Sequence, residues 1–171
     1  MSADNPLAIN LYVLTYDRNK KLTNVSSAGK DNLKTYLSQY RMLTDAINIK
    51  DGYIVNIGIE FDITVLPGNN TNAVLVQCIN VLKAMFAIDK YSFSSAIYMK
   101  DIYLALANVV GVQSVVDVRV YNKFGADNGY SKYTYNIENA TYKDVIYPSL
   151  DPSVFEVKFP NEDIKGKVVT Y

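Results

Sequence analysis

The chain has 171 residues, of which 49% are hydrophobic and 20% charged, with 17 basic side chains against 17 acidic ones. This composition is that of a globular domain that can bury roughly 70% of its unfolded surface, and it excludes disorder as the main state. A net charge of zero argues against nucleic acid and membrane surfaces as partners, because both are bound through clustered Lys and Arg. No apolar run approaches the ~20 residues of a membrane span.

Reactive side chains are scarce in this sequence. Histidine is absent, which excludes His-based triads, dyads and zinc sites. The single cysteine, Cys78, cannot form an intrachain disulfide, and Met1–Pro6 lacks the basic start of a signal peptide. We therefore expect synthesis inside the cell, and we expect no catalytic, cofactor or metal site.

The N-terminal third predicts a strand followed by a helix. Residues 8–16 are β-branched and aromatic, and apolar side chains on both faces indicate a central or covered strand. A helix is expected over about 28–43, with Ser27 as a possible cap. Its apolar face consists of Leu33, Tyr36, Leu37, Tyr40 and Leu43.

The clearest pattern is a strand over Tyr53–Val65. Its odd-numbered positions are all apolar and alternate with Ile54, Asn56, Gly58, Glu60, Asp62 and Thr64. A period of two with one polar face is typical of an antiparallel sheet whose second face is open to solvent.

Two more helices and a strand are expected next. Pro67-Gly68-Asn69-Asn70 predicts a turn, and Asn70, Thr71 or Asn72 can cap the helix that follows. The apolar stripe of that helix contains Cys78, so we expect a buried thiol with a raised pKa. A third helix at about 98–108 ends before Gly111, a residue suited to a left-handed conformation, and a strand is expected over 112–121.

This order of elements predicts an α+β fold. We expect a mainly antiparallel sheet with two to three helices packed on one face, in a split βαβ-like core over residues 1–125. Residues 126–171 are rich in Tyr, Asn and Pro, so we expect an irregular extension without regular central strands. Its predicted short strands are 131–137 and 154–159.

Glu60 and Asp62 are the main candidates for chemistry. Two residues apart on one strand, both carboxylates project from the same face, a geometry that suits acid/base catalysis or a hard cation. A structural interpretation is stronger, because Arg119 can pair with one of them across the sheet. No glycine-rich pattern indicates a phosphate-binding loop.

Tyrosine is abundant, with fifteen residues and no tryptophan. Tyrosine combines a large apolar area with a polar tip and is enriched at protein interfaces. We favour partner contact for the group in the extension, and a glycan-binding platform is the competing interpretation. The group consists of Tyr130, Tyr133, Tyr135, Tyr142 and Tyr147.

Four stretches resemble a known family. They are INLYVLTYDRNKKLT from Ile9, LKTYLSQYRMLTDAINIKDGYIVNIGIEFDI from Leu33, NVVGVQSV from Asn108 and VIYPSLDPSVFEVKFPNEDIKGKVV from Val145. Together they resemble the baseplate wedge proteins of T-even-like contractile-tailed bacteriophages, in the C-terminal region that belongs to the wider baseplate J-like group. The resemblance covers nearly the whole chain, and the last stretch is the most specific.

The resemblance implies a structural role in the virion. Proteins of this family dimerise, join into a ring around the tail hub, link neighbouring wedges and rearrange when the tail sheath contracts. It implies assembly in the host cytoplasm, with other wedge subunits and a second copy of the chain as partners. Because family members are several hundred residues long, it also implies that this chain is an expressed fragment, a split gene or a truncated gene model.

The sequence and the resemblance both favour a non-enzymatic assembly protein. We expect five apolar residues of the extension to lie in or beside a subunit contact, because that stretch has few core partners. They are Tyr147, Pro148, Leu150, Phe155 and Phe159. The alternatives are a glycan- or receptor-binding module of a virion and, less favoured, a hydrolase that uses Glu60 and Asp62.

Overall fold

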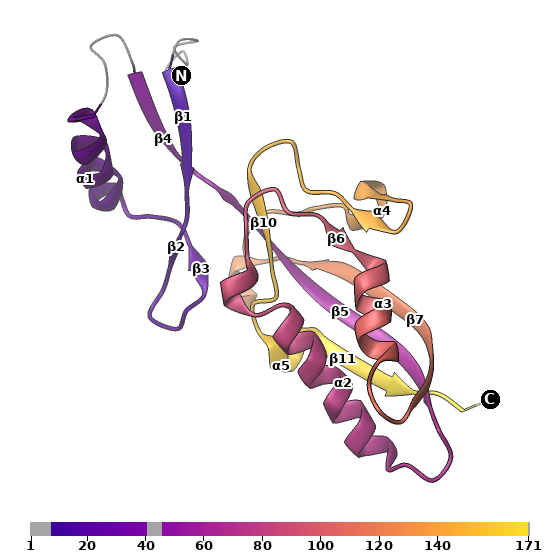
Figure 1. The fold of residues 1–171 in the computed structure, drawn as a ribbon. Coiled ribbons are helices and arrows are strands. Elements are labelled where there is room, and N and C mark those ends of the chain that lie inside the picture. The colour runs from indigo at the N-terminus through magenta and orange to yellow at the C-terminus, as the bar shows by residue number, and fades with distance from the viewer. Residues whose placement is uncertain (1–7, 41–45, 171) are drawn as a thin grey trace. The chain divides into compact units, whose positions relative to one another are not determined.

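The computed structural model describes residues 8–40 and 46–170 (Figure 1). Helices and strands are both abundant, so the predicted α+β class is confirmed. The chain forms two compact units that divide between Tyr53 and Ile54. The boundary predicted at residue 125 lies inside the second unit and stays a prediction.

The first unit contains two parallel strands and one helix. β1 (Ala8–Val13) pairs with β4 (Ala46–Asp51), and a small hairpin of β2 (Thr15–Tyr16) and β3 (Leu22–Thr23) precedes α1 (Ser27–Ser38). The hydroxyl of Ser26, rather than that of Ser27, caps α1 by accepting the Gly29 N–H. The helix ends at Ser38, earlier than the predicted end at Leu43, a residue that lies outside the described ones.

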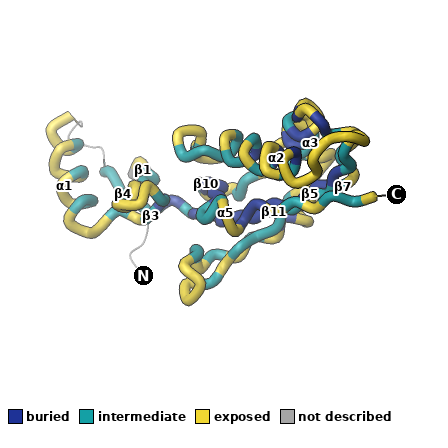
Figure 2. The backbone as a smooth tube through the Cα atoms, turned by 90° about the horizontal axis from the view of Figure 1, so that it is seen from below, coloured by how far each residue is buried: buried dark blue, intermediate teal, exposed yellow. Residues whose placement is uncertain are grey.

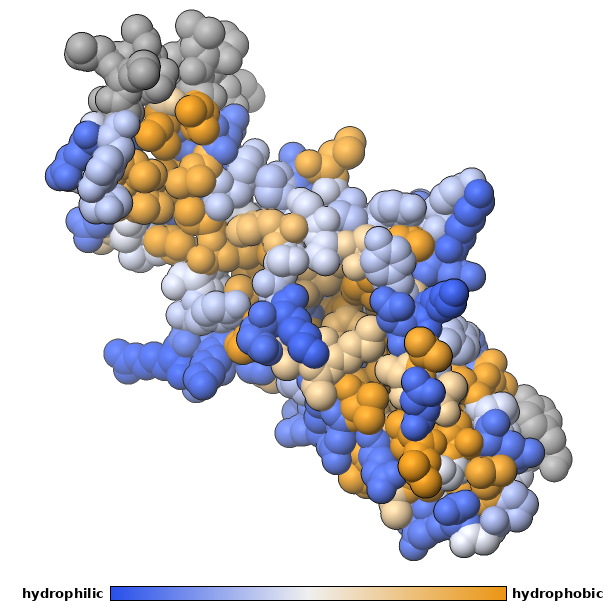
Figure 3. Space-filling view, in the orientation of Figure 1, coloured by the Kyte–Doolittle hydropathy of each residue, from blue (hydrophilic) through white to orange (hydrophobic). Residues whose placement is uncertain are grey.

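The first unit buries little of its apolar surface. The register sets Ile9 beside Ile47 and Leu11 beside Ile49, yet none of these four side chains is buried. Among residues 9–40 and 46–53, Leu22 and Gly52 are the buried ones. Figure 3 shows apolar side chains exposed on this unit beside the helix.

The second unit is built around the predicted long strand, β5 (Tyr53–Val65), which is confirmed at both ends. It pairs antiparallel with β7 (Val112–Lys123) and parallel with β11 (Ile164–Val168), and β10 (Ser153–Glu156) also pairs with it. Two strands that follow residue 125 therefore belong to the central sheet. Each of them pairs with β5 alone among the described strands, so both are edge strands, in agreement with the expectation that this part of the chain contributes no regular central strand.

Two helices cover the apolar face of this sheet. Asn70 caps α2 (Thr71–Met85) by accepting the N–H groups of Asn72 and Ala73, and α3 (Met99–Ala107) precedes a left-handed Gly111 with φ +96°. The core combines one face of β5 with residues of both helices, as the dark segments of Figure 2 show. Its fully buried members include Ile57, Ile59, Phe61, Ile63, Cys78, Leu82, Ile102 and Leu106.

The second face of β5 is only partly open. Ile54, Asn56 and Gly58 are buried there, whereas Glu60, Asp62 and Thr64 are half-exposed. The chain after β7, which contains the short 3-10 helix η2 (Ala126–Asn128), returns over this face, and the Ser131 N–H donates to Asn56 Oδ1 at 2.7 Å. The predicted solvent-open face is therefore wrong for the first half of the strand.

The remaining elements are short. The 3-10 helix η1 (Ile88–Lys90) follows α2, and β6 (Ile97–Tyr98), β9 (Val145–Ile146) and β8 (Thr141–Tyr142) form a separate small sheet. The helices α4 (Ile137–Ala140) and α5 (Pro160–Asp163) precede β8 and β11 respectively.

The predicted strand over 131–137 does not exist. The N–H groups of Ser131, Tyr133 and Tyr135 donate to side chains instead of to a strand partner. The second predicted strand, over 154–159, is right in part, because β10 begins at Ser153 and ends at Glu156.

Candidate functional site

The carboxylate pair on β5 lies where the alternation predicted it, and cross-strand partners engage it. Arg119 Nη2 is 3.3 Å from Asp62 Oδ2, and its Nη1 is 3.2 Å from Asp117 Oδ2, which confirms the predicted pairing of Arg119 with a carboxylate. Because the Arg119 side chain is half-exposed, these pairs stabilise the fold by at most about 1 kcal/mol.

Glu60 has a tyrosine as its neighbour. The Tyr121 hydroxyl donates to Glu60 Oε1 at 3.4 Å, and burial, followed by the charge of Glu60, raises the pKa of Tyr121. A phenol with a raised pKa is a poorer proton donor near neutral pH. Within the described residues, no group of three His, Cys, Asp or Glu side chains is arranged to hold a metal ion. The geometry therefore supports a strand-to-strand polar contact better than a reaction centre.

Cys78 is a core residue, as predicted. Its side chain is fully buried on α2, and burial raises the pKa of the thiol. Since the thiolate is the nucleophilic form of cysteine, this environment makes Cys78 unreactive.

A buried polar cluster on the second face of β5 was not predicted from the sequence. Asn56 Nδ2 donates to Glu156 Oε2 at 2.7 Å, and Asp163 accepts the Tyr130 hydroxyl at 2.6 Å and the Phe159 N–H at 2.8 Å. Glu156 and Asp163 are both fully buried carboxyl side chains. They hold the C-terminal segments against the sheet. Glu156 interrupts an apolar run, and that interruption was the only signal of its role in the sequence.

The structure separates the five predicted contact residues into two sets. Leu150 is fully exposed and Tyr147 is half-exposed, with Pro148 between them partly buried. Phe155 is only 7% exposed and packs edge-on against the Tyr135 ring, and the partly buried Phe159 packs in the same way against Tyr130. Residues 147–150 therefore form an apolar arm, a name we keep below, while both phenylalanines already have partners in the chain.

The tyrosine group divides similarly. Tyr130, Tyr133 and Tyr135 are partly buried, and the Tyr135 hydroxyl donates to the Tyr147 carbonyl at 2.6 Å. Tyr142 and Tyr147 are exposed, and Tyr147 is part of the apolar arm.

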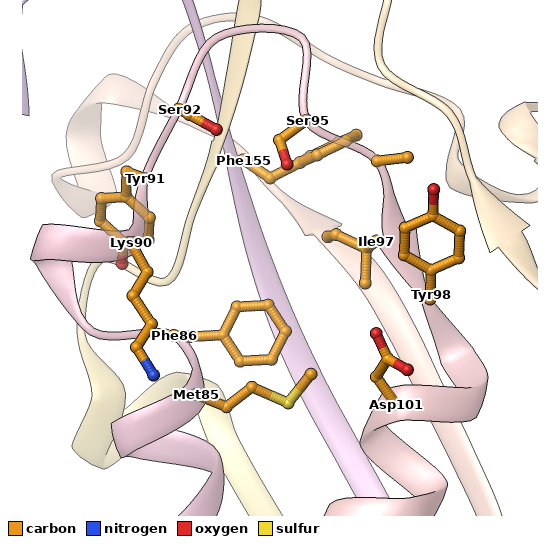
Figure 4. Close-up of a pocket in the computed structure, with 11 residues that line it drawn as sticks. Met85, Phe86, Lys90, Tyr91, Ser92, Ser95, Ile97, Tyr98, Asp101 and Phe155 are labelled. Atoms are coloured by element: carbon orange, nitrogen blue, oxygen red, sulfur yellow. The ribbon is translucent and has the colours of Figure 1, made fainter.

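A cavity of about 150 Å³ opens between the C-terminal end of α2, β6 and the first turn of α3 (Figure 4). Met85, Phe86, Ile97 and Phe155 give it apolar walls, and Lys90 and Asp101 place opposite charges on its rim. Tyr91 and Tyr98 stand beside the opening, and Tyr98 is 53% exposed. The cavity can hold a small group with an apolar face and polar edges.

None of the described helices is both long and apolar enough to cross a membrane. The chain matches no known protein family and no curated protein.

Proposed function

We propose that the chain is a structural subunit of a phage tail baseplate wedge. In that role it contributes to the ring of wedge proteins around the hub and to the rearrangement of the baseplate on tail contraction. Its partners are other wedge subunits and a second copy of the chain, in the virion after assembly in the host cytoplasm. The motif resemblance and the engaged state of the carboxylates support this role over an enzymatic one.

The observation that carries the proposal is the apolar arm. A fully exposed leucine beside an exposed tyrosine is unfavourable in water, and apolar anchors of this kind supply much of the affinity at protein contacts. The arm is also well positioned, because the Tyr135 hydroxyl and the Ala140 carbonyl both bond the Tyr147 backbone. A positioned arm loses less conformational entropy on binding.

The test is light scattering of the purified chain, alone and mixed with the other wedge subunits. We expect association, and we expect Leu150→Ser combined with Tyr147→Ser to weaken it at least tenfold, which corresponds to about 1.4 kcal/mol. Leu66→Ser is the matched control, since Leu66 is a 43% exposed leucine in the turn after β5. A wild-type chain that stays monomeric and ignores every wedge subunit would contradict the proposal.

The cavity in Figure 4 favours a second candidate, a glycan- or receptor-binding module. Tyr91 and Tyr98 offer aromatic faces, and Asp101 and Ser95 offer hydrogen-bonding groups, which is the mixture that sugar rings require. Retention of specific glycans on an array, lost in Tyr98→Ala, would favour this function. An array without any retained glycan would exclude it.

A further inference from the structure

The edge of β7 that faces away from β5 pairs with no other strand of the described residues. β5 is the one strand that pairs with β7 among the strands of the described residues, and Figure 1 shows β7 as the outermost strand of its sheet. A strand in this position presents backbone N–H and C=O groups that can bind another strand.

The backbone groups that face outward can be assigned. The Val118 N–H donates to the hydroxyl of Tyr103 on α3 at 3.1 Å, so Val118 turns its backbone away from β5. Alternate residues of an antiparallel strand face the same edge. The Val120 N–H and C=O and the Val118 C=O therefore also point away from β5.

The edge formed by β11 carries charged residues that discourage strand pairing. The β7 edge is irregular only between Val112 and Asp117, and beyond that stretch Tyr103 binds its backbone at Val118. β11 is short, and its exposed Lys165 and Lys167 are the kind of charged residues that discourage edge pairing. On β7 the corresponding cation, Arg119, is held by Asp62 and Asp117. Its charge is therefore already neutralised by the chain itself.

A groove of about 500 Å³ runs along this edge. Val118, Arg119, Val120 and Tyr121 form one side, and Ile137, Thr141 and Ile146 of the small sheet and α4 contribute to the other. Its charged lining residues are Glu60, Glu138 and Asp144 against Arg119 alone. The lining of the groove therefore combines apolar side chains with more acidic than basic ones.

We propose that this groove binds an extended segment of another protein, in which basic residues alternate with apolar ones. The segment adds a strand to β7 by bonding the Val118 C=O and the Val120 N–H and C=O. Its apolar side chains pack beside the partly buried Val120, and its Lys or Arg side chains face Glu60, Glu138 and Asp144. This mode of recognition takes affinity from the main chain and specificity from alternate side chains. It goes beyond the proposed wedge function and does not depend on it.

The probe is a synthetic peptide of alternating Lys and Val, measured by fluorescence anisotropy against the full chain. We expect saturable binding, at least tenfold weaker binding of the matching Glu–Val peptide, and loss of binding when alternate backbone nitrogens of the Lys–Val peptide are methylated. Hydrogen exchange of the Val120 amide should slow on binding. Equal binding of the methylated peptide, or no binding of the Lys–Val peptide at millimolar concentration, would overturn the proposal.

Two variants sharpen the test. Val120→Pro removes the outward N–H and should weaken binding at least tenfold, whereas Val120→Ala, which loses similar packing but keeps that N–H, should retain most of it. Glu138→Lys should shift preference towards the Glu–Val peptide, and Glu162→Lys, at an exposed acid on α5 outside the groove, should not. Association through the apolar arm should not change in Val120→Pro. A failure of the groove proposal can therefore be distinguished from a failure of the wedge proposal.

Discussion

The Tyr130–Asp163 pair shows how one buried carboxylate fixes a long loop. Asp163 is fully buried, and the 2.6 Å bond from the Tyr130 hydroxyl satisfies one of its oxygens. Burial first, and then the hydrogen bond and charge of Asp163, raise the pKa of Tyr130 above the usual value. The folded state therefore holds the Tyr130 proton more tightly than the unfolded chain does.

This difference predicts how stability depends on pH. The unfolded tyrosine titrates at about pH 10, so the contribution of Tyr130 is fully present below that pH and is lost as the pH rises towards the higher folded pKa. Tyr130→Phe should lower the free energy of unfolding by about 1 to 3 kcal/mol near pH 7, since it leaves a buried carboxylate oxygen without this bond. The same variant should lose stability less steeply above pH 10.

Urea unfolding at several pH values measures both effects. Tyr142→Phe is the control, because its hydroxyl belongs to an exposed residue. An equal alkaline loss in wild type and Tyr130→Phe would assign the pH dependence to other groups.

At the scale of elements, the packing of α2 on β11 requires a glycine. A Cβ at Gly166 would lie 2.7 Å from Leu75 Cδ1 on α2 and would collide with the Phe61 ring on β5. Phe61 is almost fully buried, so its ring has little room to move. We expect Gly166→Ala to destabilise the protein by about 1 to 3 kcal/mol, the range for overpacked cores.

The measurement is again the free energy of unfolding in urea. Lys165→Ala changes the neighbouring exposed residue of the same strand and should alter stability by no more than about 0.5 kcal/mol. If Gly166→Ala is as stable as wild type, α2 and β11 can move apart to admit the added methyl group without a loss of stability.

Among the helices and strands, the sequence predicts those that depend on local signals and misses those that depend on distant partners. The period of Tyr53–Val65 and the Asn70 cap are local signals, and the structure has both. β11 was missed because its short sequence, Ile-Lys-Gly-Lys-Val, has weak strand character and gains its place from a distant partner.

The residues of the candidate sites are likewise predictable where the pattern is local, and not where their partners are distant in the chain. The pairing of Arg119 was predictable, since alternation on two long strands fixes which side chains share a face. Phe155 was expected at a subunit contact because its partner, the Tyr135 ring, is not visible as a neighbour in the sequence. Glu156 was missed for the same reason, as its partner Asn56 lies 100 residues away.

At the scale of the whole molecule, the buried apolar side chains lie mostly in the second unit and scarcely in the first. Every member of the main hydrophobic cluster lies between Val55 and Val168. A segment of about 50 residues that buries few apolar side chains is marginal by itself. We therefore expect residues 52–171 to fold cooperatively as a separate chain and residues 1–53 not to do so.

Circular dichroism during urea titration of the two fragments checks this prediction. The longer fragment should show a single sigmoidal transition, and the shorter fragment should change gradually without a midpoint. A sharp transition in residues 1–53 would show that the first unit has a stabilising core of its own.

The parallel pairing of β11 with β5 has a consequence for biosynthesis. β11 is translated roughly a hundred residues after the strand beside which it lies, and such distant pairings are slow to form. While the ribosome is still making the intervening chain, the edge of β5 that later pairs with β11 lacks this partner. Nascent chains of this protein should therefore be clients of chaperones, and prematurely terminated products should aggregate.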